Sequence, residues 1–288
     1  MHSILGRLRE TDIRREPFPY AVIANALPPD YYETLAAGFP KTRDFGREDG
    51  LGNNKLHHLA SRDVLDDPSV PEIWRDFIAH HSSAGFFREV CAIWGEEIER
   101  SRHELLKGYD KPLAEFTVGR RVEGKRSSEG NQNRDIVLDC QFSINSPVTK
   151  LSSVRGPHLD SPFKLFAALL YFRDPEDDSS GGDFEIYRLK PGRLPLPKPS
   201  KVNSGYVQPI RRIRYAPNTL VFFVNTRHAY HGVTPRTVTP RPRRYVNFLG
   251  ECYAGNRNGF LSPTNPNLDP RWRAKLTKAY RYKWALGL

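Results

Sequence analysis

The sequence has 288 residues, with 44 Lys and Arg against 33 Asp and Glu, so its formal net charge is +11. Such an excess attracts anions, including nucleic acid and acidic metabolites. The three cysteines, Cys91, Cys140 and Cys252, are far apart, which argues against a disulfide framework or a zinc knuckle and favours a reducing compartment. No run approaches the roughly 20 apolar residues of a membrane span, and we expect a cytoplasmic protein.

The first elements follow from apolar spacing and turn residues. Residues 17–25 are rich in β-formers and predict a strand that leads into a helix starting near Pro29 or Asp30. Apolar residues then recur every four positions at Leu27, Tyr31, Leu35 and Phe39, a stripe expected to pack on a sheet. The polar stretch 41–55 shows no period and predicts a loop.

Two further helices are expected, one over 71–78 and a longer one capped by Ser82 or Ser83. Their aromatic side chains fit a core better than a cofactor pocket. The tandem histidines His57-His58 and His80-His81 diverge in direction on either a helix or a strand, so surface or packing roles are favoured. The basic, glycine-rich stretch 119–134 predicts a loop, which either is a solvated hairpin loop or closes over an anionic substrate.

From Ile136 onward, short β-rich runs are separated by Gly, Pro, Asn or Asp turns. This spacing predicts a mainly β protein with flanking helices, of the sandwich or jelly-roll class. The proline-rich segment from Leu189 to Pro209 is predicted to be a surface insertion. The expected strands are 136–145, 164–172, 183–188, 212–215, 219–224 and 244–249.

The chain is expected to form one continuous domain in three regions. Residues 1–134 would pack a strand and helices on the core, 135–255 would form the core, and 256–288 would form a basic helix. Asp269-Pro270 is a strong helix start for the last region. Its aromatic stripe favours docking on the core, with a nucleic-acid or membrane surface as the alternative.

Candidate metal ligands occur in two places. His158 and Asp160 are separated by one residue, so on a strand both side chains point the same way, about 6–7 Å apart. His231 follows the apolar run 220–224 and offers a third ligand, with His228 as its rival. Two histidines and one carboxylate on one side of a metal are the facial arrangement of non-haem Fe(II) oxygenases.

Four pieces in this order resemble the Fe(II)/2-oxoglutarate dioxygenase superfamily on its prolyl-4-hydroxylase-like side. They are His158-x-Asp160, Gly181-Gly182-Asp183-Phe184, His231-Gly-Val-Thr-Pro and Arg243-Arg244-Tyr245. The resemblance implies a double-stranded β-helix (jelly-roll) core, Fe(II) held by His158, Asp160 and His231, 2-oxoglutarate as cosubstrate and O2 as oxidant. Ascorbate could serve as a reductant. The Gly-Val-Thr-Pro after His231 favours His231 over His228.

The resemblance also implies a cation for the distal carboxylate of 2-oxoglutarate. Counting ten residues from His231 gives Arg241, whereas matching the strand before Tyr245 gives Arg244, which we favour. Alternation would then direct Arg244, Val246 and Phe248 into the interior and Arg243 outward. Expected helpers in the cavity are Thr234, Asn247 and a residue of the polar set Gln141, Ser143 and Asn145.

The resulting hypothesis is a hydroxylase acting on a small or carrier-linked metabolite, with the basic loops favouring an anionic one. Alternatives are a protein prolyl hydroxylase, a non-catalytic jelly-roll binding protein and a cupin-like isomerase that uses another metal. Asp160 argues against a halogenase, which lacks the carboxylate ligand. A nucleic-acid repair enzyme would carry a second Arg six residues after the first, where this sequence has Gly250, or Leu249 counted from Arg243.

Overall fold

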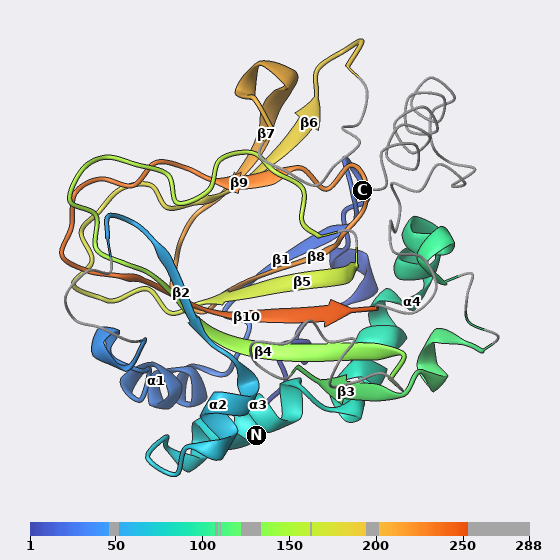
Figure 1. Cartoon of the computed structure of the whole chain (residues 1–288), viewed down its shortest axis with the longest axis horizontal. Coiled ribbons are helices and arrows are strands. Elements are labelled where there is room, and N and C mark those ends of the chain that lie inside the picture. Colours follow the sequence, from blue (N-terminus) through green and yellow to red (C-terminus); the bar gives the residue numbers. More distant parts are fainter. Residues whose placement is uncertain are drawn as a thin grey trace, which may run out of the picture.

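A computed structural model describes residues 1–45, 52–106, 109, 111–121, 134–161, 163–193 and 202–252 (Figure 1). The described strands form one sheet of seven strands and one of three. This arrangement confirms the predicted mainly β, jelly-roll-like class. Among the described residues, no helix is both long enough and apolar enough to cross a membrane.

The seven-stranded sheet carries most of the core. Its order is β1-β8-β5-β10-β4-β2, with β3 added beside β4. Every pairing is antiparallel except the one between β3 and β4. The bounds in this order are β1 (Tyr20–Ala24), β8 (Thr219–Val224), β5 (Lys164–Tyr171), β10 (Arg243–Glu251), β4 (Ile136–Asn145), β2 (Leu56–Leu59) and β3 (Val118–Arg120).

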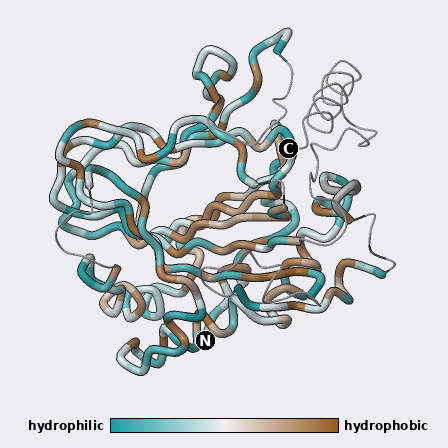
Figure 2. Tube along the Cα trace, in the orientation of Figure 1, coloured by the Kyte–Doolittle hydropathy of each residue, from teal (hydrophilic) through white to brown (hydrophobic). Residues whose placement is uncertain are grey.

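Helices cover one face of this sheet (Figure 1). Because side chains alternate along a strand, Phe142, Phe222 and Phe248 all point to the helical side, where they join Trp74 and Trp94 in one buried cluster. The strands of this sheet carry much of the hydrophobic colouring in Figure 2. The helices are α1 (Pro29–Ala37), α2 (Ser61–Asp66), α3 (Glu72–His81) and α4 (Ala84–Leu106), and short 3-10 turns are η1 (Glu10–Asp12), η2 (Thr42–Phe45), η3 (Leu113–Glu115) and η4 (Ser204–Tyr206).

The opposite face of the large sheet packs on the three-stranded sheet. That sheet has the order β7 (Val207–Ile213), β6 (Phe184–Leu189) and β9 (His231–Val233). Tyr171, Phe223 and Tyr245 of the large sheet share a second buried cluster with Phe184 and Ile186 of the small one. The space between the two sheets is therefore lined by both, and it contains the candidate site.

Several boundaries differ from the predictions. The predicted loop 41–55 contains the turn η2, and the predicted insertion 189–209 ends in β7, which begins at Val207 and includes Pro209. Pro209 is tolerated because β7 is an edge strand, where a missing N–H leaves no ladder bond unmade. Most of the predicted loop 119–134 and the whole predicted C-terminal helix lie outside the described residues.

Candidate metal centre

His158, Asp160 and His231 lie together between the two sheets. Their potential ligand atoms are all within 4.8 Å of one another, and all three side chains are buried. His158 Nε2 lies 3.7 Å from Asp160 Oδ1, and His231 Nε2 lies 4.0 Å from Asp160 Oδ2. The structure thus brings together the three residues that the sequence motifs singled out.

Backbone pairing brings the two histidines side by side. His158 N–H donates to the His231 carbonyl at 2.9 Å, and His231 N–H donates back to the His158 carbonyl at 3.1 Å. This is an isolated antiparallel bridge, so His158 and Asp160 stand on an extended segment and not on the regular strand that was expected. Gly232 permits the close approach, because a Cβ there would lie 2.9 Å from the Gly156 carbonyl carbon.

Hydrogen bonds to backbone carbonyls orient both imidazoles. His158 Nδ1 lies 2.9 Å from the Gly156 oxygen, and His231 Nδ1 lies 2.8 Å from the Ala229 oxygen. A carbonyl oxygen only accepts, so each Nδ1 carries the proton. The lone pair of each Nε2 is consequently left for a metal, which is how histidine ligands are usually fixed.

Two cations flank the Asp160 carboxylate. Lys164 Nζ donates to Oδ2 at 3.1 Å, and Arg155 Nη1 approaches Oδ1 at 3.5 Å. Burial alone would raise the pKa of Asp160, but the charge of Lys164 and the neighbouring histidines hold that pKa well below its ordinary value. The carboxylate therefore stays ionised, as a metal ligand must be.

Aromatic rings enclose His231. Its ring stacks on Phe184 at a centroid distance of 5.2 Å and lies 4.7 Å from Phe223. Burial, followed by the adjacent His158, lowers the pKa of His231 to about 3. Its imidazole is therefore neutral near pH 7 and able to coordinate.

Arg243 lies in an aromatic cage on the metal-facing side of the large sheet. Its Cζ is 4.8–4.9 Å from the ring centroids of Tyr171, Tyr215 and Tyr245. Nε donates to the Gly182 carbonyl at 2.7 Å, and Nη1 donates to Asn145 Oδ1 at 3.3 Å. No described carboxylate pairs with this guanidinium, although only 2% of the residue is exposed.

Unpartnered polar atoms cluster in the same place. Arg243 Nη2, Asn145 Nδ2 and the Tyr171 hydroxyl are buried without a hydrogen-bond partner among the described residues. A buried charge and buried donors without partners are costly, so the arrangement favours an anionic ligand. Gly181-Gly182 shapes this pocket: both residues have positive φ, and a Cβ on Gly181 would lie 1.8 Å from the Pro235 oxygen.

The predicted directions of the two arginines are wrong. Arg244, Val246 and Phe248 point to the helical face of β10, whereas Arg243 points to the metal side. Arg244 Nε donates to the Phe172 carbonyl at 3.0 Å, and its Nη2 lies 3.5 Å from Asp174. The physical reason is strand alternation: the apolar residues of even number face the helices, and they carry Arg244 with them.

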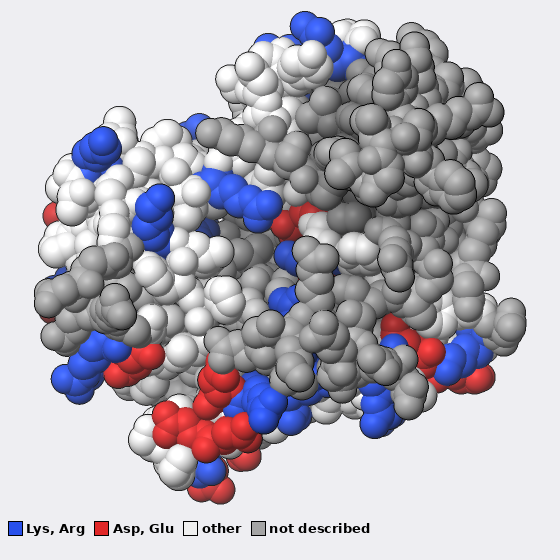
Figure 3. Space-filling view, in the orientation of Figure 1, with Lys and Arg blue, Asp and Glu red and all other residues white. Residues whose placement is uncertain are grey.

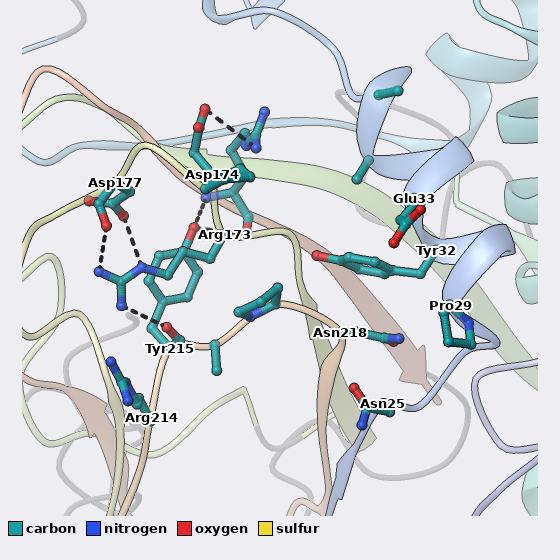
Figure 4. Close-up of a pocket in the computed structure, with 16 residues that line it drawn as sticks. Asn25, Pro29, Tyr32, Glu33, Arg173, Asp174, Asp177, Arg214, Tyr215 and Asn218 are labelled. Atoms are coloured by element: carbon teal, nitrogen blue, oxygen red, sulfur yellow. Dashed lines mark hydrogen bonds and ion pairs between the residues drawn. The ribbon is translucent and has the colours of Figure 1, made fainter.

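Arg244 lines a cavity of about 910 Å³ between α1 and the loops after β5 and β7. Figure 4 shows Tyr32 and Glu33 of α1 on one side of it and Arg173 and Tyr215 on the other. None of the three clustered metal-binding candidates lines this cavity. It is therefore separate from the metal centre.

The remaining predicted residues take different places. Arg241 is partly exposed and pairs with Glu176, and the Thr234 hydroxyl accepts the Asp183 N–H at 3.0 Å. Neither joins the cluster. His228 is exposed and its Nε2 accepts from Arg227, so it is also outside the described metal cluster.

Gln141 and Asn247 do lie on the metal-facing side of the sheet. Asn247 Nδ2 donates to Gln141 Oε1 at 3.4 Å, and Gln141 Nε2 donates to Asp139 at 2.6 Å. Ser143 and Asn145 alternate with apolar core residues on β4, as expected. In the antiparallel register Asn145 is the partner of Arg243, so both residues lie on the same face of the sheet. The polar residues of β4 therefore already indicate, in the sequence, that Arg243 and not Arg244 faces the metal side.

Comparisons with known proteins find similar solved structures. No protein-family model matches the sequence, and no curated protein matches it. A prolyl-4-hydroxylase from Pseudomonas putida is 14% identical, with 82% of this chain and 93% of that chain covered and a TM-score of 0.44. A prolyl 4-hydroxylase from Phytophthora capsici is also 14% identical, covering 90% and 66%, with a TM-score of 0.45.

A third similar structure is SnoN, a non-haem α-ketoglutarate-dependent epimerase from nogalamycin biosynthesis. It is 12% identical, with 87% of each chain covered and a TM-score of 0.41. The similar structures thus include two prolyl 4-hydroxylases and one α-ketoglutarate-dependent epimerase. At such low identity the similarity concerns the chain arrangement, and the function must be argued from the side chains.

Proposed function

We propose that the protein is an Fe(II)- and 2-oxoglutarate-dependent oxygenase that hydroxylates a C–H bond of a small or carrier-linked, anionic metabolite. The observation that carries the proposal is the pairing of two features in one space between the sheets. One is the buried His158, Asp160 and His231 cluster, and the other is the buried guanidinium of Arg243, which has no carboxylate partner among the described residues.

The donor set of the cluster fits Fe(II). Two imidazoles and one carboxylate are the ligands of the facial triad in non-haem iron oxygenases, which leaves the other side of the ion for cosubstrate and dioxygen. His158 and His231 would each coordinate through Nε2, since their Nδ1 atoms are bonded to carbonyls. Asp160 would supply the carboxylate oxygen.

The cage around Arg243 fits the distal carboxylate of 2-oxoglutarate. Arg243 Nη2, Asn145 Nδ2 and the Tyr171 hydroxyl offer donors that no described group uses. A planar guanidinium binds a carboxylate with two parallel hydrogen bonds. When bound, Fe(II) and 2-oxoglutarate supply the oxidation of a substrate C–H bond by O2, with release of succinate and carbon dioxide.

The other side chains of the site would orient the metal ligands and exclude water from the metal centre. Phe184 and Phe223 pack against the His231 ring and keep water from that side of the centre. Lys164 keeps the Asp160 carboxylate ionised and pointed at the histidines. A preorganised, water-poor site limits side reactions of the oxidant, while the oxidation itself belongs to the metal and the cosubstrate.

Anaerobic titration of the purified protein with Fe(II) and 2-oxoglutarate tests the proposal. We expect a weak visible charge-transfer band in the wild type. Arg243→Gln should lower the affinity for 2-oxoglutarate by roughly 100-fold or more, because breaking a buried charged pair costs about 3–5 kcal/mol. The adjacent Arg244→Gln is the matched control and should keep the wild-type affinity.

The outcomes separate the alternatives. A folded wild type without the band would favour the non-catalytic binding protein. If the protein binds a metal but Arg243→Gln has the same 2-oxoglutarate affinity as the wild type, the cupin-like isomerase would be favoured. A band followed by succinate release with metabolites, in the presence of ascorbate, would support the oxygenase, and turnover of a proline-containing peptide would favour the prolyl hydroxylase.

A further inference from the structure

The described side chains at the metal centre include three cations, Lys164, Arg155 and Arg243, and one anion, Asp160. In the proposed loaded state the iron dication and the 2-oxoglutarate dianion cancel, as do Asp160 and Arg243. Lys164 and Arg155 then remain, both in contact with Asp160. Figure 3 shows Lys and Arg atoms beside the hollow between the two sheets.

The neighbouring described charged groups pair with one another and not with Lys164 or Arg155. Arg236 pairs with Asp177 at 2.7 Å, and Arg121 pairs with Glu251. Asp139 Oδ2 lies 3.9 Å from Arg121, and the Asp139 carboxylate also accepts hydrogen bonds from Gln141 and from the Ser61 N–H. Among the described groups, Lys164 and Arg155 therefore have no carboxylate partner other than Asp160.

The two cations differ in how they are held. Lys164 begins β5, only 16% of its side chain is exposed, and its hydrogen bond to Asp160 is short. Arg155 is on the loop before His158, 53% of its side chain is exposed, and its contact with Asp160 is long. Arg155 is therefore the more weakly held and the more exposed of the two, and its guanidinium is the one available to a further anion.

The backbone nevertheless fixes Arg155 beside the metal. Its carbonyl accepts the Val233 N–H at 2.9 Å, and the Ser153 hydroxyl donates to the Val233 carbonyl at 2.6 Å. The loop is therefore tied to β9, the strand that carries His231. The Arg155 guanidinium stays at the partly exposed edge of the centre, where a substrate would enter.

From this geometry we infer that Arg155 binds an oxyanion of the substrate, a carboxylate or a phosphate, next to the metal. The inference rests on the proposed function and names the residue that selects an anionic substrate. The half-exposed guanidinium of Arg155 offers two parallel N–H donors, which match either oxyanion.

The experiment uses the full chain loaded with Mn(II) and 2-oxoglutarate. Relaxation of ³¹P in methylphosphonate and of ¹⁹F in trifluoroacetate reports binding of a phosphate-like and a carboxylate probe close to the paramagnetic ion. We expect enhanced relaxation of at least one probe in the wild type. Arg155→Gln should weaken that probe's binding about 10- to 100-fold, as expected for lost charge-assisted hydrogen bonds, and Arg155→Lys should weaken it less.

Arg62→Gln is the matched control, because Arg62 is also 53% exposed but pairs with Asp66 on α2. It should bind the probe as the wild type does. Equal thermal midpoints would show that each variant is folded. If the Fe(II)/2-oxoglutarate band forms but no probe depends on Arg155, the inference is overturned and the proposed function stands. If the band does not form, both are overturned.

Discussion

At the scale of single residues, the motif around His231 singles out, of two nearby histidines, the one that lies beside His158 and Asp160. His231 lies in the cluster with His158 and Asp160, and His228 is exposed beside Arg227. The spacing of the motif carries this information because the chain must pair at His231 to bring its side chain to His158. Local sequence is thus enough to locate a side chain where a backbone hydrogen-bond pattern fixes its position.

This difference leads to a test with a matched pair. His231→Gln should weaken Co(II) binding by more than the roughly 10- to 100-fold that loss of an outer-shell partner costs, since it removes a direct ligand. His228→Gln should bind Co(II) like the wild type. Visible absorption of the bound Co(II) measures both. Equal affinities of the two variants would contradict the assignment of His231 to the metal.

At the scale of elements, the strands and helices were largely predictable, but the facing of β10 was not. Arg243 and Arg244 are adjacent and chemically identical, so neither residue type nor motif says which faces the metal. The apolar residues Val246 and Phe248 settle it, because they belong to the cluster under the helices. Alternation alone predicts that Arg244, Val246 and Phe248 share one buried face. It does not say which face, because β10 is buried both under the helices and between the two sheets.

The contact between β9 and the loop before His158 gives an element-scale prediction. Gly232→Ala should destabilise the fold by about 1–3 kcal/mol, the usual cost of overpacking, and should weaken Co(II) binding because the loop that carries His158 must move. Gly95→Ala is the control, since a Cβ there meets nothing within 4 Å. Placed in α4, it should stabilise by about 0.5–1 kcal/mol.

Urea unfolding and Co(II) titration measure the two effects of the glycine pair. A Gly232→Ala protein with wild-type stability and Co(II) affinity would show that the loop and β9 are not closely packed. The same reasoning explains Gly181-Gly182, whose glycines were recognised as part of a motif. Their physical role, to let the chain pass the Pro235 carbonyl, depends on a distant segment that the local sequence does not reveal.

At the scale of the whole molecule, a buried histidine ties the N-terminal segment to the core. His81 of α3 accepts the Ile4 N–H at Nε2, and its Nδ1 lies 2.7 Å from the Phe77 oxygen. Surface or packing roles are predicted for the histidines of this pair, but the partner of His81 is not predictable from local sequence, because Ile4 lies 77 positions earlier (81 − 4). Burial, offset in part by the Phe77 carbonyl, lowers the pKa of His81 to about 3.

This histidine should make the metal-free protein sensitive to acid. Between its unfolded pKa of about 6.5 and its folded pKa of about 3, the unfolded chain binds one more proton than the folded chain. Stability should therefore fall as the pH falls through this window, by about 1.4 kcal/mol per pH unit for this group. His81→Gln should lose that part of the slope.

Urea unfolding of both proteins at several pH values between 4 and 6 measures the slope. His231 adds a contribution of the same sign, which is unchanged in the variant and so cancels in the comparison. Identical slopes for wild type and His81→Gln would mean that His81 is protonated in the folded state.

The bridge between His158 and His231 joins residues that are 73 positions apart (231 − 158) through two backbone hydrogen bonds, beside the bond from the Val233 N–H to the Arg155 carbonyl. An ion seated there would act as a reversible cross-link between the small sheet and the chain leading into β5. Free-energy linkage then adds about 2.7 kcal/mol to folding at a ligand concentration of 100 Kd. If Fe(II) binds there as proposed, its removal should lower the folding stability of the protein as well as its activity.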